Sequence, residues 1–256
     1  MIGEKTLDRI ATRILMNGAL ELRDVPVKVS NEEVPSLSKC NQPFLYASGY
    51  WGPGYVTIKG QVGDQSLMVM LCKYLAFEIA EKWPTGVDFV AGNVTGGVVP
   101  GWEVSRALTE LLGKTIPFVY IRELRKAGGQ KELITGIQNV PFGSSGLDME
   151  ELVNFAQTIR NGASCLEAAG YVAKQGACIL YYDNPVADKE LAEAGIEMVW
   201  LLTLARLLDS VESIGEVCAI GLDRHKCLVD YRQFLKDPMQ WQADRGLTRV
   251  EKGGTK

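Results

Sequence analysis

The chain has 256 residues, of which 46% are hydrophobic and 23% charged, with a formal net charge of −4 and a pI near 5.3. These values are ordinary for a folded globular protein and exclude wholesale disorder. The acidic balance provides no electrostatic footprint for nucleic acid, so we expect no nucleic-acid partner.

The beginning of the chain and its cysteines indicate a reduced, cytoplasmic protein. Residues 1–15 read MIGEKTLDRIATRIL, which is charged and amphipathic rather than a signal peptide, and no apolar run approaches the ~20 residues of a membrane span. We therefore expect no membrane partner. The six cysteines are scattered without a C-x-x-C pair, and together with the single His225 they form no recognisable metal-binding pattern.

The first quarter of the chain predicts a helix followed by an irregular, hood-like segment. Residues 6–16 place their apolar side chains on one helical face. Residues 31–63 are rich in turns and aromatic side chains and suggest short strands around a Gly/Pro turn. A strongly periodic helix follows, with Leu67, Leu71 and Leu75 among its apolar positions.

From residue 87 onward, strands alternate with helices. The predicted strands are residues 87–92, 116–121, 177–182 and 197–203, and the predicted helices are residues 100–112, 164–175, 187–195 and 204–211. This alternation predicts an α/β fold with a parallel sheet flanked by helices, whose ligands bind beyond the carboxyl ends of the strands. We divide the chain into an N-terminal helix and hood (1–65), an α/β core (66–212) and a C-terminal helical extension with a tail (213–256).

Two of the loops at that edge could bind an anion. GNVTGG (92–97) follows the first core strand, and glycines there would let backbone N–H groups approach a phosphate, although such turns also serve tight packing alone. RELRKAGGQKELITG (122–136) contains Arg122, Arg125, Lys126 and Lys131, which suit a diphosphate. By itself, this second loop is more typical of a solvated charged hairpin.

The third loop is MEELVNFAQTIRNGAS (149–164), with two adjacent carboxylates before a polar stretch. Ser164 and Glu167 form a capping-box pattern, which predicts that a helix begins at Ser164. Glu150 and Glu151 could take the two hydroxyls of a ribose, and the polar stretch behind them could receive a phosphate. The alternative is a solvated turn.

In this order, the segments resemble the type I phosphoribosyltransferases over residues 15–210, and among them most the orotate phosphoribosyltransferases. Four stretches carry the resemblance: 47–60 (a Ser-Gly and Pro-x-Tyr segment near the base pocket), 87–108 (first core strand, diphosphate loop and helix), 118–136 (a mobile cationic loop) and 149–164 (the acidic signature for phosphoribosyl diphosphate, PRPP). Residues 197–209 also resemble the late strand and helix of the family. The order of these stretches is more specific than any single one.

The resemblance implies an enzyme of nucleotide metabolism and pyrimidine biosynthesis that uses PRPP and Mg²⁺ and displaces diphosphate with a nitrogenous base. It implies that Arg122 and Lys126 stabilise the leaving diphosphate, and that Mg²⁺ binds mainly through the substrate, with Glu150 or Glu151 as a further ligand. PRPP would contact Glu150, Glu151, Thr158, Asn161, Gly162, Ser164, Thr95, Gly96 and Gly97, and the base pocket would contain Ala47, Tyr50, Tyr55 and Asn184. Orotate-type relatives pair, so a homodimer is expected.

The sequence departs from the orotate pattern on the base side. Ala47 and Asn184 stand where the family has a lysine and an arginine, which favours a different and neutral base. Glu123 replaces a cation and Gly128 a histidine in the mobile loop, and the signature loop reads as several residues longer than the family's compact Thr-Thr-Gly.

Two functions therefore stay open. The chain is a phosphoribosyltransferase of altered base specificity, or it is a non-catalytic homologue that binds PRPP or a nucleotide as a regulator or assembly component. Tyr50, Trp51 and Tyr55 are available for base stacking and equally fit a packed core.

Overall fold

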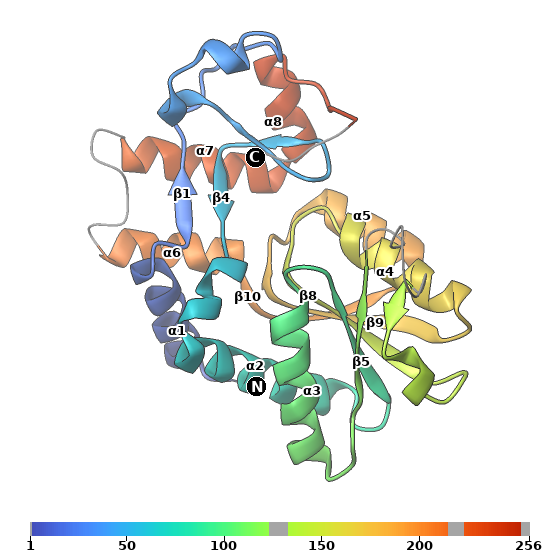
Figure 1. The fold of residues 1–256 in the computed structure, drawn as a ribbon. Helices are drawn as coiled ribbons and strands as arrows, with labels where there is room; N and C mark the ends of the chain where they lie inside the picture. Colours follow the sequence, from blue (N-terminus) through green and yellow to red (C-terminus); the bar gives the residue numbers. More distant parts are fainter. Residues whose placement is uncertain (1, 123–132, 215–222, 252–256) are drawn as a thin grey trace.

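The computed structural model describes residues 2–122, 133–214 and 223–251. Figure 1 shows two lobes that stand one above the other. The lower lobe contains the main sheet with helices α1 to α6. The upper lobe consists of the segment between strands β1 and β4 together with helices α7 and α8, and the β1–β4 ribbon runs between the lobes.

In the described residues, the lower lobe is built on a sheet of six strands in the order β10-β9-β8-β5-β6-β7. All neighbouring pairs are parallel except β6 and β7, which are antiparallel. The strands are β5 (Phe89–Asn93), β6 (Phe118–Ile121), β7 (Ile134–Thr135), β8 (Ser145–Val153), β9 (Val172–Tyr181) and β10 (Glu197–Thr203). Because β8, β5 and β6 are parallel neighbours, the loops that follow them emerge at the same edge.

Helices cover both faces of this sheet, as expected for a parallel sheet that is buried on both sides. On one face lie α2 (Gln65–Lys82) and α3 (Val98–Leu112), and on the other lie α4 (Gln157–Ala168) and α5 (Pro185–Ala194). One cluster of buried apolar side chains lies on the α4 and α5 face, and a second lies on the α2 and α3 face and continues into the upper lobe. Among the described residues, none of the helices combines the length and apolar character that crossing a bilayer would require.

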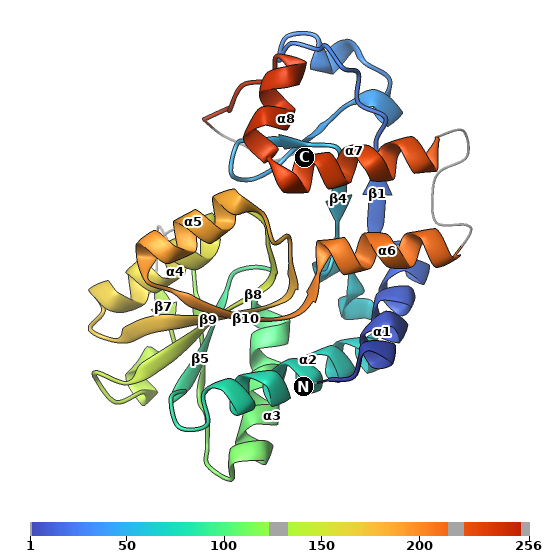
Figure 2. The ribbon, with the colours of Figure 1, turned by 180° about the vertical axis from the view of Figure 1, so that it is seen from behind.

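Two further helices pack beside the edge strand β10. The N-terminal helix α1 (Glu4–Met16) lies against α6 (Leu204–Ile214), and Figure 2 shows the pair from behind. Arg206 of α6 forms ion pairs with Glu4 and Asp8 of α1, which join the N-terminal helix to the last helix of the α/β core. The N-terminal helix is therefore part of the lower lobe.

Both ends of the chain build the upper lobe. Two short ribbons, β1–β4 and β2–β3, pack against the C-terminal helices, and Trp51 N donates to Gln242 Oε1 at 2.9 Å. The elements are β1 (Leu20–Leu22), β2 (Phe44–Leu45), β3 (Trp51–Gly52), β4 (Gly54–Val56), α7 (Arg224–Lys236) and α8 (Pro238–Arg245), with 3₁₀ turns at Val34–Ser36 and Lys39–Asn41. A further 3₁₀ turn, Lys59–Gly63, follows β4 and packs on α2 of the lower lobe. The predicted N-terminal hood thus needs the C-terminal helices to complete it, and the division of the chain at residues 65 and 212 stays a prediction.

Short polar residues fix where several helices begin. The side chains of Asp64, Asn184, Asp223 and Asp237 accept hydrogen bonds from the first backbone N–H groups of α2, α5, α7 and α8, respectively. Pro185 and Pro238 follow two of these caps at positions where the missing N–H costs nothing.

The prediction that a helix begins at Ser164 was wrong. Helix α4 begins at Gln157, so Ser164 lies in its interior, and the segment predicted as helix beyond Ala168 contains the first residues of β9. Glu150 and Glu151 belong to the nine-residue strand β8 rather than to a loop. The connection from β8 to α4 is only Asn154–Ala156, so the signature loop is compact, contrary to the predicted insertion.

Candidate active site

A cavity of about 1110 Å³ opens beside α4 at the carboxyl edge of the sheet. Its walls come from the β2–β3 turn of the upper lobe, from the ends of β5 and β6, and from α4. Six residues predicted from the sequence line it, namely Ala47, Arg122, Thr158, Asn161, Gly162 and Ser164. Residues about 120 positions apart in the chain therefore meet at one cavity, where we place the candidate site.

The first turn of α4 provides free backbone donors at this cavity. Ala156 at the helix N-terminus has φ 57°, and no side chain of the described residues caps the helix. The N–H of Arg160 is the first to bond to a loop carbonyl, that of Ala156. The N–H groups of the first turn, together with the Thr158 hydroxyl, can therefore receive an anion, which the helix dipole favours.

The strand that leads into α4 carries three carboxyl groups. Asp148 and Glu150 point to the α4 side of β8, and Glu151 points to the α3 side, because side chains alternate along a strand. Burial raises the pKa of Glu150 well above its usual value, and the neighbouring Glu151 charge raises it further. The two adjacent glutamates therefore differ in environment, with Glu150 almost fully buried and Glu151 half-buried.

The turn between β5 and α3 packs closely on this acidic strand. A Cβ on Gly96 would lie 1.7 Å from Glu151 Oε2, and a Cβ on Gly97 would lie 2.2 Å from the Met149 carbonyl oxygen. Gly97 faces backbone atoms and therefore has a packing role whether or not it binds diphosphate, whereas a side chain at Gly96 would require the Glu151 carboxylate to move. Thr95 accepts a long backbone hydrogen bond from Val98 in the same turn. The structure thus brings the predicted diphosphate turn and Glu151 together.

Sequence analysis did not identify a buried polar pair beneath the cavity. Asn93, which lines the cavity, donates through Nδ2 to Asp148 Oδ1 at 2.5 Å. Gly162 lets α4 approach this pair, because a Cβ there would lie 2.3 Å from Asp148 Oδ2 and 2.7 Å from Asn93 Oδ1. In the sequence, this pair could have been inferred from Asp148, the polar residue in the otherwise apolar run GLDM. A carboxyl group in a strand that is buried on both faces needs a polar partner.

Arg122 lies at the end of β6 and is held by its own strand pair. Its Nη2 donates to the Tyr120 hydroxyl at 2.9 Å and its Nε donates to Thr135 Oγ1 at 3.2 Å, with the guanidinium 5.2 Å from the centre of the Tyr120 ring. Its guanidinium is therefore preorganised at the rim of the cavity. Lys126, the second predicted catalytic cation, lies outside the described residues.

The predicted base-pocket residues are not all brought to one place. Ala47 lines the cavity, whereas the Tyr50 ring packs 4.7 Å from the ring of Phe155 in the β8–α4 loop. Tyr55 packs on Phe44 in the upper lobe. Asn184 is fully buried, and it caps α5 and donates to the Asn154 carbonyl at 2.6 Å. Asn184 therefore fixes the loop that precedes α4.

Comparison with known proteins finds sequence relatives that are named orotate phosphoribosyltransferase. The orotate phosphoribosyltransferase of Streptococcus pneumoniae serotype 19F is 28% identical over 210 residues, which cover 80% of this chain and 90% of that protein. That of Rhizobium meliloti is 25% identical over 214 residues, which cover 83% and 86%, respectively. No family model matches the chain.

Solved structures give the same fold. The orotate phosphoribosyltransferase of Aeropyrum pernix aligns with a TM-score of 0.58 and 21% identity over 80% of this chain and 99% of that one. The UMP synthase of Leishmania donovani aligns with a TM-score of 0.62 and 16% identity over 91% of this chain, which spans 42% of that longer chain. An adenine phosphoribosyltransferase from Trypanosoma brucei aligns with a TM-score of 0.53 and 13% identity over 87% and 88% of the two chains.

The chain therefore has the type I phosphoribosyltransferase fold, and the predicted fold class is confirmed. In sequence it is similar to proteins named orotate phosphoribosyltransferase, and the similarity extends along most of their length. The resemblance seen in the sequence is thus confirmed, while the roles of individual residues stay predictions.

Proposed function

We propose that the protein is a phosphoribosyltransferase that uses PRPP and Mg²⁺ to attach phosphoribose to a nitrogenous base. The observation that carries this proposal is the uncapped first turn of α4, which faces the cavity directly after a strand that bears Glu150 and Glu151. A phosphate site and adjacent carboxylates in this order suit a ribose phosphate.

The 5′-phosphate binds at the start of α4. The N–H groups of the first turn and the Thr158 hydroxyl donate to it, and Asn161, Gly162 and Ser164 form the wall behind. Glu150 and Glu151 hold the ribose hydroxyls, and the turn of Thr95, Gly96 and Gly97 receives the diphosphate through its backbone donors. The close packing of Gly96 on Glu151 supports this arrangement, because it makes the two subsites adjacent.

The leaving diphosphate gains negative charge as the bond at C1 of the ribose breaks, and Arg122 and Lys126 stabilise it. Carboxylate oxygens are the donors that Mg²⁺ prefers, so the half-buried Glu151 beside Gly96 fits a metal held mainly by substrate oxygens, with Glu150 as the alternative ligand. Mg²⁺, when bound, supplies further neutralising charge on the phosphates. In the described residues no cluster of three or more histidine, cysteine and acidic side chains could hold a metal alone.

Two positions of the proposed acceptor site lack the cations that the orotate pattern has there. Ala47 presents no charge to the cavity, and Asn184 is used by the α5 cap and the Asn154 carbonyl. We therefore propose that recognition of the base is altered at these two positions. We also propose a cytoplasmic homodimer, supported by exposed apolar side chains on α3, among them Trp102 at 61% exposure.

Isothermal titration calorimetry of the whole chain with PRPP and Mg²⁺ tests the binding step. We expect saturable binding that the double substitution Glu150→Gln with Glu151→Gln weakens at least about tenfold, since it removes the ribose contacts. Glu32→Gln with Glu33→Gln, an adjacent exposed acidic pair in the upper lobe, is the matched control and should bind as the wild type does. Absence of binding up to about 1 mM PRPP would refute the proposal.

A second measurement separates the enzyme from a non-catalytic homologue. Release of diphosphate is followed with a panel of purine, pyrimidine and pyridine bases. Two observations support the non-catalytic alternative. Asn154, Phe155 and Ala156 stand in place of the family's Thr-Thr-Gly, and hydrogen bonds to Tyr120 and Thr135 hold Arg122 on its own strand pair. Binding of PRPP without diphosphate release for any base would favour that alternative.

A further inference from the structure

The turn that connects β2 and β3 projects over the cavity, and the C-terminal segment holds it there. Gly49 N donates to the Tyr46 carbonyl and Tyr46 N donates to the Tyr50 carbonyl, which closes the turn with Ala47 exposed at its tip. Val250 N donates to the Gly49 carbonyl at 2.9 Å. Residues beyond the span that resembles the phosphoribosyltransferases therefore hold the turn from which Ala47 lines the cavity.

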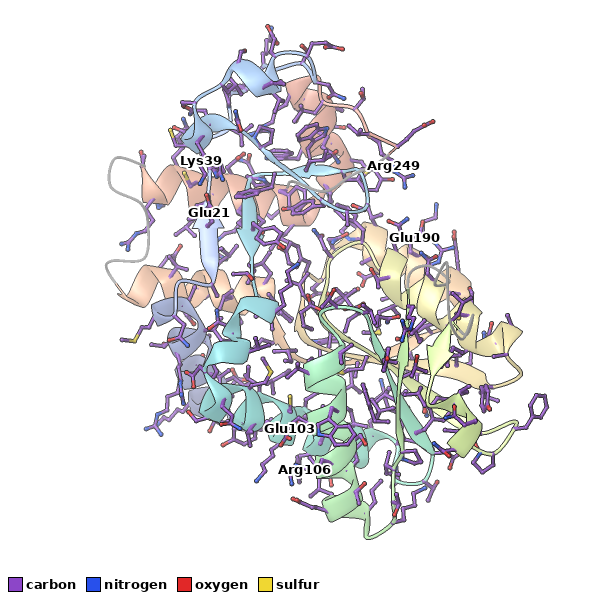
Figure 3. The ribbon with its side chains drawn as sticks, in the orientation of Figure 1. Glu21, Lys39, Glu103, Arg106, Glu190 and Arg249 are labelled. Carbon is purple, nitrogen blue, oxygen red and sulfur yellow. The ribbon has the colours of Figure 1, made fainter. Side chains whose placement is uncertain are left out.

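Arg249 makes the most specific of these contacts. Its Nε donates to the Ser48 carbonyl at 3.0 Å, and its guanidinium lies 4.8 Å from the centre of the Tyr50 ring. Figure 3 labels Arg249 at the edge of the upper lobe, on the side of α5. Stacking on Tyr50 and the bond to Ser48 fix the orientation of the guanidinium, and they leave its terminal Nη donors without a partner among the described residues.

Unlike other arginines of the upper lobe, Arg249 forms no ion pair with any residue that the structure describes. Arg23, Arg232 and Arg245 in the same lobe each form an ion pair with a carboxylate. In the described part of the chain no carboxylate pairs with Arg249. The neighbouring Ser48 Oγ is buried and has no hydrogen-bond partner in the described residues either. A positive charge and an unused hydroxyl therefore stand next to the turn that lines the cavity.

We propose that Arg249 is a specificity-determining residue that recognises an anionic substituent, a carboxylate, on the acceptor base. This inference rests on the proposed function, since it assigns the acceptor side of the same cavity. The turn itself presents only Ala47, so an acidic base would find no cation there. Arg249 supplies that charge from a distant part of the sequence, which reverses the sequence-based expectation of a neutral base.

Product nucleotides test the assignment without requiring turnover. Orotidine 5′-monophosphate and uridine 5′-monophosphate differ only by a carboxylate on the base, and both can bind through the phosphate. By calorimetry we expect the wild type to bind the carboxylated nucleotide about tenfold more tightly. Arg249→Gln should remove that preference and leave the affinities for uridine 5′-monophosphate and PRPP unchanged, whereas Arg249→Lys should keep part of it.

Arg232→Gln is the matched control, since Arg232 lies on α7 and pairs with Asp209 and Glu212. It should keep the full preference. The assignment is overturned if the wild type binds both nucleotides equally, or if Arg249→Gln weakens both by the same factor. Failure of both nucleotides to bind would refute the phosphate site of the proposed function itself. Tight nucleotide binding without diphosphate release for any base would refute only catalysis.

Discussion

Asp148 is the residue whose environment is most unusual. It is fully buried between β8 and α4, it accepts one hydrogen bond from Asn93, and its Oδ2 has no partner among the described residues. Burial raises its pKa well above the usual value, against the smaller opposing effect of the Asn93 hydrogen bond. The raised pKa predicts that the folded chain keeps a proton on this carboxyl at pH values where the unfolded chain, with a pKa near 4, has released it.

This difference predicts how stability depends on pH. The folded-state pKa is raised, so the contribution of Asp148 is complete below about pH 4 and is lost as pH rises toward the folded-state pKa. Asp148→Asn should reduce the fall of the unfolding free energy between pH 5 and 8 by up to about 1.4 kcal/mol per pH unit. Glu150, whose pKa is also raised, will retain a slope of the same sign.

Urea unfolding at several pH values measures this slope. Glu81→Gln, which changes an exposed glutamate on α2, is the control and should leave the slope unaltered. An equal slope in Asp148→Asn and the wild type would show that Asp148 is ionised in the folded protein.

At the scale of elements, the periodicity of apolar residues located most helices and strands, but the capping pattern placed the start of α4 at the wrong residue. The pattern of Ser164 and Glu167 matches a capping box, yet tertiary packing begins the helix at Gln157, where no side chain caps it. Strand β8 was missed because Asp148, Glu150 and Glu151 make it polar, although its register with β5 and β9 is regular over that stretch. Both errors concern elements of the candidate site, where tertiary packing outweighs the local structural preference of the sequence.

Asn184 shows how one element positions another across this site. It caps α5 and also donates to the Asn154 carbonyl in the loop before α4. Asn184→Ala should cost about 2 to 3 kcal/mol, because the cap is lost and a carbonyl is left without its partner. It should also weaken PRPP binding, since the loop that leads into the phosphate site is released.

Asp237→Ala is the matched control, because Asp237 caps α8 through two N–H groups in the upper lobe. It should cost about 1 kcal/mol and leave PRPP affinity unchanged. Urea unfolding and calorimetry on both variants separate the two effects. If both variants lose the same stability and bind PRPP like the wild type, Asn184 is only a cap.

For the whole molecule, the sequence predicted the α/β core, but long-range contacts could not be read from it. The upper lobe joins residues 20–56 to α7 and α8 through contacts such as Trp51 with Gln242, and Arg249 with Ser48. These partners lie about 200 positions apart and carry no local signal. A resemblance that spans residues 15–210 cannot indicate that the C-terminal segment contacts the turn from which Ala47 lines the cavity.

One face of the lower lobe leaves large apolar side chains exposed. Trp102 and Val99 on α3 are 61% and 47% exposed, and a cavity of about 460 Å³ beside them is lined by Phe118 and Tyr120 of β6. Figure 3 shows α3 with Glu103 and Arg106, which pair with each other beside this apolar surface. An apolar surface next to an internal ion pair suits the interface of the proposed homodimer.

Trp102→Glu should therefore disrupt the dimer, because it places a charge at the centre of the apolar surface. Since a buried tryptophan at an interface contributes 2 kcal/mol or more, we expect the dissociation constant to rise at least about thirtyfold. Light scattering coupled to size-exclusion chromatography over a concentration series measures it. Phe142→Glu is the control, because Phe142 is 82% exposed on the connection before β8, away from α3. A wild type that is monomeric at every concentration, or a Trp102→Glu variant that pairs as tightly as the wild type, would exclude this surface as the interface.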